Sequence, residues 1–83
     1  MPHLHLHLVE RGRALLDEEG AQFSTIDAAV AKARATAREI MAYDIMERGV
    51  LNLDGYVEIV EPANGRVERV QFEEAISIRA LAA

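Results

Sequence analysis

The chain has 83 residues and no cysteine, and its five glycines lie far apart from one another. Without cysteine the protein has no disulfide bond, no thiolate nucleophile and no cysteine-ligated metal site. Isolated glycines do not form a glycine-rich phosphate loop. The serines are Ser24 and Ser77, and Ser24 fits a helix cap better than a nucleophile. The sequence therefore predicts no catalytic residue, no cofactor and no enzyme activity.

Basic side chains are scarce as well. Nine Lys and Arg residues stand against fourteen Asp and Glu residues, which gives a net charge of -5. This balance argues against non-specific binding to nucleic acid or to an anionic membrane. No apolar run reaches the roughly 18 residues of a membrane span, and the first residues lack the basic and apolar regions of a signal peptide. We therefore expect a cytoplasmic protein with neither nucleic acid nor membrane as a partner.

Apolar residues make up 51% of the chain, which excludes a disordered protein. The chain is too short for two hydrophobic cores, so the sequence predicts a single domain over residues 1–83. A domain of this size buries only roughly 60% of its unfolded surface. That small core favours a protein that buries further surface against a partner.

Residues 3–10 alternate strictly, reading His3-Leu4-His5-Leu6-His7-Leu8-Val9-Glu10. A period of two predicts a half-buried strand, with the leucines facing the core and the histidines facing away. Arg11-Gly12-Arg13 predicts a turn, and Ala14-Leu15-Leu16 predicts a short return strand. The acidic segment Asp17-Glu18-Glu19-Gly20 then reads as a solvated turn.

The longest expected element is a helix from Ser24, its N-cap, to about Arg48, with Gly49 as the stop signal. Asp27 lies three residues after the cap and meets the positive end of the helix dipole. Apolar residues recur at spacings of three and four and predict one buried face, formed by Ile26, Ala29, Val30, Ala33, Ala37, Ile40 and Met41.

Asp44 falls on the apolar stripe of this helix. Either the helix has passed the edge of the sheet there and Asp44 pairs with Arg48 at i+4, or Asp44 is a buried carboxylate suited to chemistry. The absence of other catalytic groups nearby in the sequence favours the ion pair.

Two further strands are expected at Tyr56–Glu61 and Arg66–Phe72, joined by the turn Pro62-Ala63-Asn64-Gly65. The apolar positions change parity between Val67 and Val70, which predicts a bulge or a twist. Residues 73–83 read either as a short helix or as an extended tail with Ile76, Ile78 and Leu81.

The order β-β-α-β-β predicts an α+β fold, in which a four-stranded antiparallel sheet (order 2-1-3-4) carries one long helix on one face. The other face stays open and is predicted to carry the interface residues His3, His5, His7, Tyr56, Glu58 and Val60. Small sheets commonly bury such a face against another copy or against a partner, so we expect a homodimer or an unidentified protein partner. The sequence therefore predicts a non-enzymatic protein–protein interaction module that forms a homodimer through this face or through an edge strand.

The alternating histidines also support an alternative, a metal-binding or metal-sensing protein. Residues i and i+2 of a strand lie about 6.7 Å apart on one face, and two imidazoles that lean together can chelate one ion. Three in a row do not converge easily on one ion. The candidate metal site is therefore His5 and His7 with Glu58 from the neighbouring strand, or with a ligand from a second chain across a dimer.

Several short motifs, taken in order, resemble a family of short uncharacterised bacterial proteins, a domain of unknown function. The family tends to have aromatic residues where this chain has Leu4, His5 and Leu6, so only His7 of the three histidines matches its pattern. The matching segments span nearly the whole chain: Met1-Pro2, His7-Leu8, Asp17-Glu18-Glu19-Gly20, the helix from Ser24 to Arg48, Gly55-Tyr56, Asn64-Gly65-Arg66-Val67 and Phe72-Glu73-Glu74-Ala75.

This resemblance implies no known activity, substrate or cofactor. The strand–strand–turn–helix portion is also broadly similar to the partner-binding antitoxin domains of the HicB kind. The second likeness is an analogy of fold, and fold does not carry function.

Overall fold

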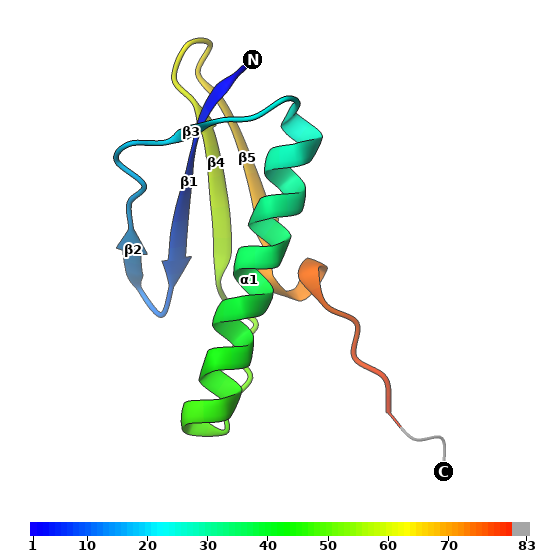
Figure 1. Ribbon diagram of the computed structural model, residues 1–83. Helices are drawn as coiled ribbons and strands as arrows, with labels where there is room; N and C mark the ends of the chain where they lie inside the picture. The colour runs from blue at the N-terminus through cyan, green and yellow to red at the C-terminus, as the bar shows by residue number, and fades with distance from the viewer. Residues whose placement is uncertain (81–83) are drawn as a thin grey trace.

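The computed structural model describes residues 1–80 as a sheet with one long helix across it (Figure 1). The α+β fold predicted from the sequence is confirmed. The elements in chain order are β1 (His3–Glu10), β2 (Arg13–Leu15), β3 (Ala21–Gln22), α1 (Ile26–Arg48), β4 (Tyr56–Glu61), β5 (Arg66–Gln71) and the 3-10 helix η1 (Phe72–Ala75).

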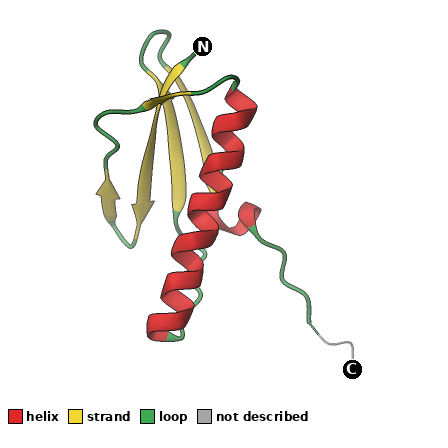
Figure 2. Ribbon diagram, viewed as in Figure 1, coloured by secondary structure: helices red, strands yellow, loops and turns green. Residues whose placement is uncertain are grey.

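The sheet is antiparallel, with the order β2-β1-β4-β5. The four expected strands therefore lie in the predicted sequence of neighbours, with β1 inside the sheet. The sheet differs from the prediction by a fifth strand, because β3 pairs with the start of β1 on the same side as β2. The loop between β2 and β3 spans the outer side of β1 (Figure 2).

The two hairpin turns lie where the sequence places them. Arg11 and Gly12 both have positive φ, which is the conformation that a two-residue hairpin turn requires. At the second turn the Gly65 N–H donates to the Glu61 carbonyl at 2.9 Å. The predicted bulge in β5 is wrong: β4 and β5 pair in unbroken register, so Val67 lies on the open face while Val70 points to the core.

Helix α1 begins one residue later than expected. Its N-cap is Thr25 rather than Ser24, and the Thr25 hydroxyl accepts a hydrogen bond from the Ala28 N–H at 3.1 Å. This position leaves Ile26 inside the helix, where it packs against the core. The helix ends as predicted at Gly49, which takes a left-handed conformation. No helix in residues 1–80 has the length and apolarity needed to cross a membrane.

The core lies between α1 and the sheet. The helix contributes mainly small side chains, Ala29, Ala33 and Ala37, which are completely buried. Small residues allow a helix to approach a sheet closely. The sheet and η1 supply larger side chains. Those that are fully or almost fully buried are Leu4, Val57, Ile59, Val70 and Phe72. The predicted apolar stripe of the helix is confirmed.

The last described residues combine both sequence-based alternatives for residues 73–83. A short 3-10 helix, η1, is followed by an extended segment at residues 76–80 that leads away from the body of the protein (Figure 1). Ile76 packs against the core, whereas Ile78 is exposed. Leu81 lies outside the described residues.

Replacing Gly55 with alanine should destabilise the protein by about 1–3 kcal/mol, the usual range for overpacking a core. A Cβ atom at position 55 would lie 2.6 Å from Cζ of the buried Phe72 ring. Urea unfolding of Gly55→Ala, Phe72→Leu and the double variant measures this contact. We expect the double variant to lose less than the sum of the two single losses, and additive losses would contradict the contact.

Candidate functional site

The three histidine rings form a ladder along β1. The centroids of His3 and His5 are 5.4 Å apart with the rings edge-to-face, and those of His5 and His7 are 5.9 Å apart with the rings stacked. Each ring hydrogen-bonds the acidic turn: His3 Nε2 meets the Glu19 carbonyl (2.9 Å), His5 Nδ1 meets the Asp17 carbonyl (2.6 Å), and His7 Nδ1 accepts from the Asp17 N–H (2.9 Å). The ladder therefore holds the turn in place.

Asp17 accepts a backbone hydrogen bond at the outer edge of β1, where no strand pairs with it. Because β2 and β3 pair with the two ends of β1, the centre of the strand around Leu6 has no strand partner on that side. Asp17 Oδ2 accepts the Leu6 N–H at 3.1 Å, and Oδ1 accepts the Gly20 N–H at 3.1 Å. We name this arrangement the Asp17 clasp: Asp17 with Leu6, Gly20, His5 and His7.

The clasp lowers the pKa of the Asp17 carboxyl below its ordinary value of 3.8. The hydrogen bond from Leu6 is the largest cause, and burial works in the opposite direction by disfavouring the charged form. The Gly20 N–H and the nearby His5 and His7 rings lower the pKa further. Asp17 is therefore ionised at neutral pH, as its two backbone donors require.

The clasp also determines the tautomers of two histidines. A backbone N–H only donates, so His7 Nδ1 is unprotonated and the neutral ring carries its proton on Nε2. A carbonyl oxygen only accepts, so His5 carries its proton on Nδ1 and leaves a lone pair on Nε2. Of these two rings, His5 alone presents an Nε2 lone pair, which is the form that binds a metal.

The predicted metal set does not converge. His7 lies directly opposite Glu58 across the β1–β4 pair, but Glu58 Oε2 accepts a hydrogen bond from Arg69 Nε at 3.2 Å. In residues 1–80 no three His, Asp or Glu side chains are grouped so that they could hold a metal ion. The alternative based on His5, His7 and Glu58 gains no support from the described residues.

The predicted interface residues share the face of the sheet that α1 leaves uncovered, which we call the open face. The β1–β4 register places His5 opposite Val60, His7 opposite Glu58, and Val9 opposite Tyr56. His3 continues the β1 row, since side chains two residues apart in a strand face the same way. The grouping predicted from the sequence is therefore present in the register of the sheet.

Strand β5 extends these rows with residues that were not among the predicted interface residues. Val67 pairs with Val60, and Arg69 pairs with Glu58. The Arg69 guanidinium also lies over the Tyr56 ring, 4.5 Å from its centroid. The open face thus has an apolar row and a charged row, and Val67 is 53% exposed within the apolar one.

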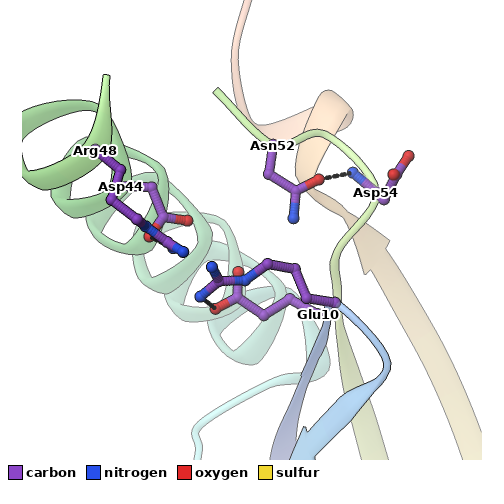
Figure 3. Close-up of polar contacts among 6 residues, drawn as sticks. Glu10, Asp44, Arg48, Asn52 and Asp54 are labelled. Atoms are coloured by element: carbon purple, nitrogen blue, oxygen red, sulfur yellow. Dashed lines mark hydrogen bonds and ion pairs between the residues drawn. The ribbon is translucent and has the colours of Figure 1, made fainter. Parts of the chain in front are cut away.

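Asp44 is buried and also ion-paired, so each sequence-based alternative holds in part. Asp44 is only 3% exposed, and its Oδ1 accepts a hydrogen bond from Arg48 Nη2 at 2.5 Å (Figure 3). Its Oδ2 is buried without a partner in the described part of the chain, as is Oε2 of Glu10. In the neighbouring loop, Asn52 Oδ1 accepts the Asp54 N–H at 3.1 Å (Figure 3). No nucleophile or proton-transfer partner accompanies Asp44 among these contacts.

Sequence reasoning missed Asp17 and Val67 for different reasons. The spacing of Asp17 and Gly20 is typical of a turn in which an Asp side chain accepts a nearby N–H, so half of the clasp had a local signal. The hydrogen bond between Asp17 and Leu6 had no local signal in the sequence, because it depends on where the loop after β2 meets β1. Val67 could have been placed by counting residues in strict register back from the four-residue turn between Glu61 and Arg66.

Comparison with known proteins gave one match. A family model described as "Domain of unknown function (DUF6894)" matches residues 3–73 of this chain. No curated protein and no solved structure matches this chain. The matched segment contains every strand of the sheet, α1 and the histidine ladder.

Replacing Asp17 with asparagine should lower stability by about 1–2 kcal/mol at neutral pH, since one hydrogen bond to a charged acceptor is lost. Because folding lowers the pKa of Asp17, its contribution is present above pH 3.8 and is lost as the pH falls through the folded value. The parent should therefore lose more stability on acidification below pH 3.8 than Asp17→Asn does. Urea unfolding at neutral and acid pH tests this, and parallel pH profiles would contradict it.

Replacing Arg48 with alanine should destabilise the protein by about 1–3 kcal/mol, because the buried Asp44 carboxylate loses its counter-ion. The additional change Asp44→Leu should recover part of that loss by removing the buried charge. Thermal unfolding measures both effects. The matched control is Lys32→Ala, which removes an exposed cation from the same helix, and equal losses in both single variants would rule out the buried pair as the cause.

Proposed function

Because the chain belongs to the DUF6894 family, a domain of unknown function, we propose a role from the surface that the fold presents. The protein is a non-enzymatic protein–protein interaction module that self-associates through its open face. The single observation that carries this proposal is that α1 packs on one face of the sheet while no described element covers the other (Figure 2).

The pattern of side chains on the open face supports a second copy as the occupant. The apolar row of Val60 and Val67 lies beside the charged row of Glu58 and Arg69, and His5 and His7 continue these two rows on β1. In a two-fold contact the same patch meets itself, so it must be self-complementary. A surface with both an apolar row and a row of both charge signs meets that requirement, since Glu58 of one copy can face Arg69 of the other.

The open face suits this role better than the edges of the sheet. The outer edge of β5 is lined by Arg66, Glu68 and Arg69, and charged side chains are a common protection against edge-to-edge pairing. On the other side β2 has only three residues, and the centre of β1 is closed by the Asp17 clasp. Neither edge offers a long unpaired strand with apolar side chains.

The size of the face predicts a weak and reversible association. Strands of eight, three, six and six residues, about 4.8 Å apart, give a projected area of about 400 Å². Stable complexes bury about 800 Å² on each partner. We therefore expect a dimer whose population depends on protein concentration rather than a permanent one.

The remaining parts of the proposal rest on composition. The net charge of -5 disfavours nucleic acids and anionic membranes as partners. Cysteine is absent and no catalytic group accompanies Asp44, which favours a binding role over an enzyme. We propose a cytoplasmic location, because small secreted domains are commonly rich in disulfide bonds and this chain has no cysteine.

Sedimentation velocity from about 10 to 500 µM tests the self-association, a range that spans weak protein contacts. The average mass should rise with concentration for the parent chain. Val67→Glu should weaken the association about tenfold or more, because it places a carboxylate in the apolar row of each copy. Val67 is half-exposed, so the substitution leaves the core intact.

The matched control is Met46→Glu, which adds the same charge at the exposed side chain of Met46 on α1, away from the open face. It should sediment as the parent does. Substituting His5 or His7 would be a poor probe, because both rings hold the Asp17 turn. A parent chain that stays monomeric over the whole range, or equal effects of the two substitutions, would disprove the open-face contact.

A further inference from the structure

A second surface lies at the β5 side of the helix, between α1 and the extended segment that follows η1. It is a groove of about 470 Å³, and its lining is mostly apolar. Two arginines lie in the lining and no acidic residue does, although the whole chain carries a charge of -5. The lining includes Arg38, Met41 and Ile45 of α1 and Ile76, Ile78 and Arg79 of the segment after η1.

A patch of complementary chemistry lies at the opposite edge of the sheet, where β2 ends. Leu15 and Leu16 are 70% and 60% exposed, which is unusual for neighbouring leucines. The exposed carboxylates of Glu18 and Glu19 follow after Asp17. Since β2 and β5 are the two outer strands, this patch and the groove lie on opposite sides of the protein (Figure 1).

The Asp17 clasp holds this patch in a defined position. Asp17 follows Leu16 directly, and its backbone N–H and carbonyl are both bonded to histidine rings of β1. Its carboxylate is bonded in addition to Leu6 and Gly20. A segment that is already ordered loses less conformational entropy on binding. The leucines are thus presented by a fixed turn.

We propose that Leu15 and Leu16 of one copy dock into the groove of the next copy, with Glu18 and Glu19 meeting Arg38 and Arg79. Apolar side chains then meet an apolar lining and carboxylates meet guanidinium groups. A second copy is the occupant because the same chain carries both complementary surfaces. The contact rests on the proposed self-association and adds to it a second, head-to-tail mode.

A head-to-tail contact differs from a two-fold contact in a measurable way. It joins two different surfaces, so each dimer still has one free leucine patch and one free groove and can add further copies. A variant with a damaged leucine patch keeps its groove, and a variant with a damaged groove keeps its leucine patch. Two such variants cannot self-associate, but together they form a closed 1:1 dimer.

The experiment uses Leu16→Glu and Ile45→Glu, each in the Val67→Glu background so that the open-face contact is weakened throughout. We expect Val67→Glu alone to retain concentration-dependent association and each double variant to sediment as a monomer. An equimolar mixture of the two double variants should form a dimer, and Met46→Glu in the same background should associate as Val67→Glu does. Circular dichroism checks that every variant is folded.

Further pairs of variants test the charges. Arg79→Glu in the Leu16→Glu partner should weaken the mixed dimer about threefold to tenfold, and Glu18→Arg in the Ile45→Glu partner should restore part of it. A mixture that remains monomeric, or a Val67→Glu chain that is monomeric throughout, would overturn the head-to-tail contact and leave the open-face proposal standing. If Leu16→Glu abolishes self-association and Val67→Glu has no effect, the open-face proposal fails and the head-to-tail contact stands.

Discussion

The carboxylate of Asp17 is the group on which the arrangement of the N-terminal half depends. The centre of β1 has no strand partner on its outer side, and a backbone N–H left unbonded there would be costly. Asp17 accepts that N–H from Leu6 and at the same time ties down Gly20. The chain therefore turns away from β1 after β2, is held mainly through Asp17, and returns to pair with β1 as β3.

This constraint gives the histidines a structural role in addition to any role in binding. Their rings satisfy the backbone of the turn and so connect the first strand to a loop that has little apolar surface of its own. Gly20 is required at the same place, since a Cβ atom there would lie 2.8 Å from the Leu4 carbonyl oxygen. Two of the proposed contact surfaces adjoin this turn: the open face through its histidines, and the leucine patch through Leu16.

The sequence predicted much of the fold because its signals there are local. Alternation in β1, the three-and-four spacing in α1 and the turn residues at Gly12 and Gly65 each report on a few neighbouring residues. The helix cap was misplaced by one residue, since Ser24 and Thr25 offer the same hydroxyl and only the structure shows which one accepts a first-turn N–H, that of Ala28. The bulge in β5 was wrong because the exposure of Val67 breaks the apolar alternation without breaking the register.

The sequence by itself determined which faces of β1, α1 and β4 meet the core, which face of the sheet stays open, and that His3, His5 and His7 share one side of a strand. Only the tertiary structure decided what those side chains contact. Asp17 lies 10 residues from His7 and 12 from His5, and the loop between them returns to the edge of β1. Periodicity describes the direction of a side chain relative to its own backbone, whereas a hydrogen-bond partner depends on where a distant segment comes back.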